Sequence, residues 1–135
     1  LDREQHKQGI DGRMQVMAAL HEAGAGILMG TDAPQQYSVP GFSLHREMER
    51  MVDAGMSPYD VLRSGTVNVG TYFSAWDTFG QIADGHRADL ILLKANPLES
   101  IGNVSNRAGV MVRGTWYSEA DIQEKLSVIA ASYRQ

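Results

Sequence analysis

The sequence contains no cysteine, and this absence restricts its chemistry. A chain without thiols forms no disulfide, has no thiolate nucleophile and offers no sulfur ligand to a metal. Any metal that it helps to bind must be held by histidine, aspartate or glutamate. The histidines are His6, His21, His45 and His86, and no two of them are spaced as His-x-His.

Two further absences bear on partners. Lysine and arginine number 12 against 16 acidic residues, for a formal net charge of −4, and no basic cluster stands out. The chain therefore lacks the electrostatic footprint of a nucleic-acid binder. The longest clear apolar run, Leu90–Leu93, is far shorter than the roughly 18 residues of a membrane span. We expect neither nucleic acid nor a membrane as a partner.

The chain begins with Leu1 rather than methionine, and its first dozen residues resemble the middle of a surface helix. We therefore expect it to be cut from a longer protein. Because a signal peptide would precede such a piece, the location in the cell stays open, with the cytoplasm slightly favoured. The hydrophobic share of 43% is still enough for one domain core.

The first third of the chain has the pattern of an α/β protein. Apolar side chains at helical spacing predict a helix over 11–22, which Gly24 ends. The apolar run over 26–30 then predicts a buried strand. A helix followed directly by a strand is typical of α/β folds.

Helix start signals follow this strand. Ser43, Ser57 and Thr66 are predicted N-caps, because a hydroxyl oxygen can accept a hydrogen bond from a free amide of the first helical turn. Pro58 and Asp60 strengthen the second signal, since proline suits the first helical position and an acid the third. We expect compact helical pieces over 43–73.

Beyond residue 78 the pattern changes to that of strands. We expect a short strand over 81–83, a strand over 89–94, and a hairpin of 110–112 with 115–117 that turns at Arg113-Gly114. Ser118 and Asp121 then open a last helix with one apolar face.

Asp32 is the residue at which we expect chemistry. It follows the predicted strand in the run Gly30-Thr31-Asp32-Ala33-Pro34. Open and closed α/β sheets place their ligands at the carboxyl ends of strands. Taken alone, the residue is also suited to capping a turn with its own side-chain oxygen, and local sequence favours that role.

Several short motifs fall in a characteristic order. They are Gly30-Thr31-Asp32-Ala33, Leu44-His45-Arg46-Glu47-Met48, Ala54-Gly55-Met56-Ser57-Pro58, Thr66-Val67-Asn68, Gly80-Gln81-Ile82, the run 85–93 and Asn96-Pro97-Leu98. From about residue 14 to about residue 117 the chain resembles the C-terminal part of the amidohydrolase superfamily, nearest to its imidazolonepropionase-like and Xaa-Pro dipeptidase-like branch. It departs from the family at Asn68-Val69-Gly70, where Asn-Pro-Ala is common, and this leaves the geometry of that helix start open.

The resemblance implies an α/β fold class. Residues 1–78 would form the last βα portion of a (β/α)8 TIM barrel, with strand 8 near 26–30. Residues 79–117 would form part of a small composite β-sandwich domain, and residues 118–135 a C-terminal helix.

The resemblance also implies a reaction. In this family a divalent metal, usually zinc, activates water that attacks a polarised carbonyl, so that the C–N bond of a small-molecule amide, cyclic amide or dipeptide is cleaved. By similarity, Asp32 would be a metal ligand and would carry the proton from that water to the leaving nitrogen. The His-x-His pair and the further ligands of such enzymes are absent from this chain.

Other site candidates are weaker. His45 is predicted in the first turn after Asp32, where it would contact substrate or be an ordinary polar helix residue. Gln35 and Tyr37 lie in the loop after Asp32 and would shape substrate specificity, although most loop residues do not.

Two hypotheses remain for the chain as a whole. In the first it is the C-terminal fragment of a metal-dependent amidohydrolase and is inactive alone, with the rest of the barrel coming from the same parent chain or from a second chain. In the second it is a truncated, non-catalytic binding or assembly module of the same fold. A barrel cut to its last strand exposes an unpaired edge, which favours association into oligomers and counts against the second hypothesis.

Overall fold

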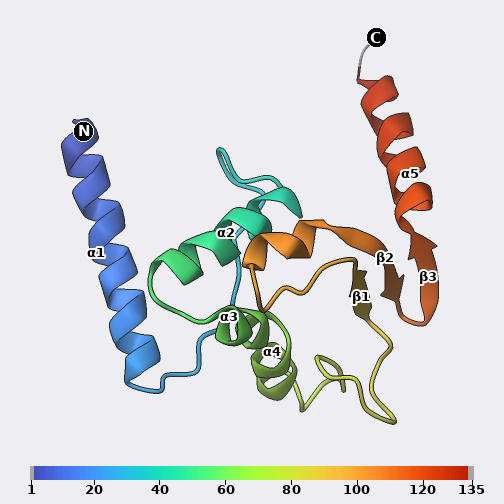
Figure 1. The fold of residues 1–135 in the computed structure, drawn as a ribbon, viewed down its shortest axis with the longest axis horizontal. Coiled ribbons are helices and arrows are strands. Elements are labelled where there is room, and N and C mark those ends of the chain that lie inside the picture. Colours follow the sequence, from blue (N-terminus) through green and yellow to red (C-terminus); the bar gives the residue numbers. More distant parts are fainter. Residues whose placement is uncertain (1, 134–135) are drawn as a thin grey trace.

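The computed structural model describes residues 2–133. Its elements, in chain order, are α1 (Arg3–Glu22), α2 (Phe42–Asp53), α3 (Pro58–Gly65), α4 (Val67–Tyr72), β1 (Leu90–Leu93), the 3-10 helix η1 (Ile101–Ser105), β2 (Arg107–Val112), β3 (Thr115–Ser118) and α5 (Glu119–Ser132). Helices α2 to α4 and η1 form the body, and α1 and α5 extend from its two sides (Figure 1). Within the described residues, no helix has the length and apolar character needed to cross a membrane.

The helix starts are partly as predicted. Ser57 caps α3 by accepting a hydrogen bond from the Asp60 amide, and Ser118 forms a reciprocal capping box with Asp121 at α5. The prediction of Ser43 as an N-cap is wrong, because Gly41 is the N-cap and α2 begins at Phe42. The Ser43 hydroxyl instead accepts a hydrogen bond from the amide of Val39. Helix α1 runs from Arg3, so it is longer than the 11–22 expected.

Helix α4 forms despite its departure from the family motif. Thr66 stands at its N-cap position, but its hydroxyl donates to the Leu62 carbonyl and makes no cap bond. Gly70 packs against the carbonyl of Phe79, and a Cβ at this position would collide with that oxygen. This close approach explains why the position suits glycine.

The sheet is antiparallel, in the order β1-β2-β3. The predicted hairpin is confirmed, with Val110 opposite Tyr117 and a turn in which Arg113 and Gly114 have φ of 49° and 81°. Two successive positive φ values are typical of the tight turn whose twist matches that of its strands. The strand predicted over 81–83 is wrong, because those residues lie outside the sheet in an irregular run.

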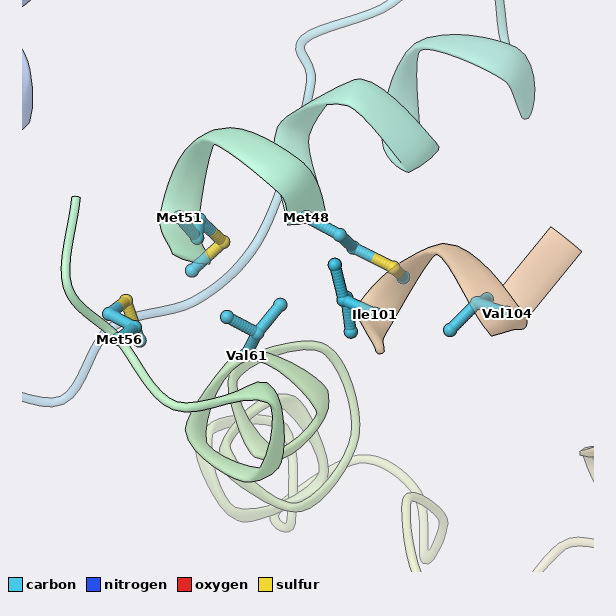
Figure 2. Packing of buried hydrophobic residues seen from close by; sticks show 6 residues of the cluster. All are labelled: Met48, Met51, Met56, Val61, Ile101 and Val104. Carbon is cyan, nitrogen blue, oxygen red and sulfur yellow. The ribbon is translucent and has the colours of Figure 1, made fainter. Parts of the chain in front are cut away.

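The core lies between α2, α3 and η1. Its buried members are Met48, Met51, Met56, Val61, Ile101 and Val104 (Figure 2). Met48 extends from α2 toward η1, whose Ile101 and Val104 lie on one side because a 3-10 helix repeats every three residues. Flexible methionines suit this junction of short elements, since they fill irregular gaps.

The segment predicted as the buried strand over 26–30 forms no strand within the described chain. A strand exists only through hydrogen bonds to a neighbouring strand, and the sheet of this structure begins far along the chain at Leu90. Its residues nevertheless alternate between half-buried and exposed positions, as they do along a strand.

Val61→Ala should lower the free energy of unfolding by about 2 kcal/mol, because it removes methyl groups from a fully buried position and leaves a cavity. Val128, which is 66% exposed on α5, is the matched control, and Val128→Ala should change that energy by less than about 0.5 kcal/mol. Urea denaturation measures both variants. Equal effects would show that Val61 is not part of the core.

An ion pair joins the start of α5 to strand β2. Arg107 on β2 donates from Nε and Nη2 to the two carboxylate oxygens of Glu119, at 3.0 and 3.1 Å. These hydrogen bonds, assisted by one from Gln123, hold the pKa of Glu119 below its ordinary value. The Arg107–Glu119 pair therefore contributes its full stabilisation of the folded state above the ordinary pKa of glutamate, about 4.3. This contribution is lost as the pH falls through the depressed pKa of Glu119.

Arg107→Met should speed hydrogen exchange in the first turns of α5 at pH 7, and the wild type should show the same change only in acid. Arg50→Met is the control, because the Arg50–Asp53 pair is exposed and lies within one helix. If both variants exchange like the wild type, the Arg107 ion pair does not hold α5.

Candidate active-site segment

The segment from Gly26 to Ala33 has two faces. Residues 27, 29, 31 and 33 are half-buried, whereas residues 26, 28, 30 and 32 are exposed. This alternation is the period of an extended strand. Ile27 and Met29 pack against the core cluster, so Asp32 lies on the face turned away from the helices.

The helices bind the backbone of this segment at two points. The amide of Met29 donates to the Ser64 carbonyl at 3.1 Å, and Asn68 Nδ2 donates to the Ile27 carbonyl at 3.0 Å. Within the described residues, the other amides of 26–30 have no hydrogen-bond partner. The segment is a strand in its pattern but lacks a sheet.

Asp32 ends this segment in an unusual backbone conformation, with φ of 51°. Aspartate tolerates this left-handed region better than most residues. Gln35 Nε2 donates to Asp32 Oδ2, and Ser38 closes the loop by donating its amide to the Gln35 carbonyl at 2.9 Å. The other carboxylate oxygen, Oδ1, accepts no hydrogen bond from residues 2–133, and Asp32 is exposed.

The structure brings only one of the other candidates to Asp32. Gln35 is bonded to it, as described above. Tyr37 is 92% exposed at the tip of the same loop, and His45 is half-buried in the first turn of α2, as predicted. In the part of the chain that the structure describes, neither Tyr37 nor His45 makes a hydrogen bond to Asp32.

The described residues do not form a metal centre by themselves. Nowhere in residues 2–133 does a group of three or more histidine, aspartate and glutamate side chains come together as a metal would require. A protein zinc site takes at least three such ligands, and Asp32 supplies one.

A cavity of about 240 Å³ lies at the opposite end of the segment. Gly26, Ile27 and Asn68 line it. His21 and Asp60 also line it, with His21 Nε2 at 3.6 Å from Asp60 Oδ2. In α/β barrels the catalytic face is at the carboxyl ends of the strands, whereas this cavity is at the beginning of the segment. The cavity lies between the end of α1, the loop that follows it and helices α3 and α4.

Sequence reasoning missed the two groups that hold the segment. Asn68 belongs to a quoted motif, yet its spacing suggests no partner 41 positions away. Ser64 is fully buried, and its hydroxyl donates to the Val61 carbonyl within its own helix. The one local signal was a polar amide at the start of a short, mostly apolar helix.

Known proteins resemble this chain in sequence and in structure. The ochratoxinase of Aspergillus niger is 30% identical over 93 residues, which are 67% of this chain and 18% of that protein. The crystal structure of a Xaa-Pro dipeptidase with bound methionine superposes with a TM-score of 0.68 at 30% identity, over 78% of this chain and 25% of that one. Phenylurea hydrolase B gives a TM-score of 0.66 at 28% identity, over 77% of this chain and 26% of that one.

The chain thus spans about a fifth to a quarter of the length of the relatives that it matches. The Amidohydrolase family profile matches residues 6–117, which include the two-faced segment, the helical core and the hairpin. The predicted resemblance is confirmed: this chain belongs to the amidohydrolase family.

Proposed function

We propose that the protein carrying this chain is a metal-dependent hydrolase of C–N bonds in amides, cyclic amides or dipeptides. The family and its hydrolase neighbours support this reaction class. The observation that carries the proposal is the place of Asp32, at the end of a two-faced segment and on the face turned away from the helices.

That placement fits a (β/α)8 barrel. In such a barrel, helices cover one face of each strand, the other face lines the interior, and catalytic groups follow the carboxyl ends. We propose that 26–30 is the eighth strand, that 1–78 belongs to the barrel and 79–117 to a small β-sandwich domain, and that 118–135 is a C-terminal helix. The missing strands come from the same parent chain or from a second one.

Asp32 has the chemistry of a proton carrier. Gln35 uses one lone pair of Oδ2, so the carboxylate keeps lone pairs both for a metal and for the proton that it would take from the attacking water and deliver to the leaving nitrogen. Tyr37, in the loop after Asp32, and His45, in the first turn of α2, are proposed substrate contacts.

A divalent metal, zinc in our proposal, would activate that water by lowering its pKa. Asp32 would be one ligand, and the others would lie outside these 135 residues, because the described chain does not suffice.

Asp32→Asn should lower kcat of the full-length enzyme by about 10² to 10⁴, since an amide of the same shape neither accepts nor donates that proton. Asp53→Asn is the matched control, because Asp53 is an exposed aspartate whose ion pair within the described residues is with Arg50 of the same helix, and turnover should be unchanged. The substrates tested are Met-Pro, a phenylurea and dihydrouracil. An Asp32→Asn enzyme with wild-type kcat would refute the proton-carrying role.

The isolated 135-residue chain should hydrolyse none of these substrates and should retain no stoichiometric Zn²⁺ after gel filtration, because one carboxylate holds zinc weakly. The full-length protein should retain zinc, lose activity to a chelator and regain it with added Zn²⁺. Elemental analysis and activity assays measure these properties. A clean monomeric chain without any longer parent protein would instead favour the non-catalytic module.

A further inference from the structure

Asn68 makes a contact that its own helix does not require. Its side chain donates to the Ile27 carbonyl across 41 positions of sequence, and it makes no cap bond to α4. The hydrogen bonds of the α4 backbone are therefore independent of this amide. Its partner is the otherwise weakly held segment that leads to Asp32.

The neighbouring helix end adds a second contact. The Ser64 carbonyl lies in the last turn of α3, where carbonyls lack partners within the helix, and it accepts the Met29 amide. The Met29 side chain lies directly against Gly65, where a Cβ would collide with it. Ile27 and Met29 are thus fixed from the same side, at alternate positions of the segment.

These contacts set the register of the segment. An extended chain advances about 3.3 Å per residue and changes face at each step, so a shift by one position would turn Asp32 toward the helices. Within the described residues, no other backbone hydrogen bond of 26–30 opposes such a shift.

We propose that Asn68 is a positioning residue, which acts with the Ser64 carbonyl to hold the backbone of Ile27 and Met29 so that the Asp32 carboxylate faces the reaction site. This inference rests on the proposed role of Asp32 and assigns a task to a residue that touches neither substrate nor metal. It predicts a larger loss of turnover than of substrate binding, because the contacts hold the segment that carries Asp32, whereas the proposed substrate contact His45 lies on α2.

The test uses Asn68→Asp in the full-length protein. The variant keeps the size of the side chain but replaces the donating group with an oxygen that repels the Ile27 carbonyl. An acid near a helix start is compatible with α4, so the helix itself is not weakened. Thr71→Ala is the matched control, because it removes the hydrogen bond from Thr71 to Val67 within α4 and reaches nothing in the segment.

Two readouts are compared. Hydrogen exchange at the Met29 amide, measured by mass spectrometry or NMR, should rise about tenfold in Asn68→Asp and stay at the wild-type rate in Thr71→Ala. With whichever substrate of the panel the wild type hydrolyses, kcat should fall about tenfold while KM changes less than about twofold. An Asn68→Asp enzyme with wild-type exchange, or with wild-type kcat, would overturn the positioning role.

Asp32→Asn is assayed in parallel to separate the two ideas. If Asp32→Asn is inactive and Asn68→Asp is fully active, the proposed function stands and the positioning role fails. If Asp32→Asn is fully active, the proposed role of Asp32 fails, and the positioning inference that rests on it fails too.

Discussion

The backbone of Gly26–Gly30 must find hydrogen-bond partners, and this requirement governs the surroundings of Asp32. Within the described residues it receives one bond at the Met29 amide and one at the Ile27 carbonyl, both from the α3–α4 corner. The other backbone groups of the segment, whose residues are half-buried or exposed, make no hydrogen bond within the described residues. The helices of this chain thus satisfy one edge of the segment, and in the proposed barrel the other edge would pair with a further strand.

The same corner belongs to the hydrophobic core, so the stability of the body and the geometry of the segment are coupled. Val61 is buried on α3 between the methionines of α2 and the residues of η1, and Ser64 follows it by one helical turn. A loss of packing at Val61 would therefore move the carbonyl that holds Met29. Close-packed interiors transmit such shifts because few voids absorb them.

Local features of the fold could be predicted from the sequence, whereas features that depend on distant partners could not. The caps at Ser57 and Ser118 and the turn at Arg113-Gly114 were predicted because each is decided by neighbours a few positions away. The strand over 81–83 was wrong and η1 was missed, because such short pieces are decided by what packs against them. At the site, Asp32 was identified by a motif, but the bond from Asn68 joins distant positions and leaves no local pattern.

The surroundings of Asp32 depend on two sets of contacts, those of the helices and those at the edge of the segment. The described chain supplies the first set alone and therefore does not complete a metal site. The helices decide which face of the segment turns outward, through contacts at Ile27 and Met29. In the proposed barrel, a strand that pairs with the free edge of the segment would bring its own side chains to the same open face. In its proposed role Asp32 needs both. A correctly oriented carboxylate without further ligands would hold no metal, and further ligands would not meet a carboxylate that lies on the other face. The hydrogen bond from Gln35 to Oδ2 also restrains the Asp32 side chain. Because both residues belong to the same loop, this bond does not depend on the helices or on a neighbouring strand.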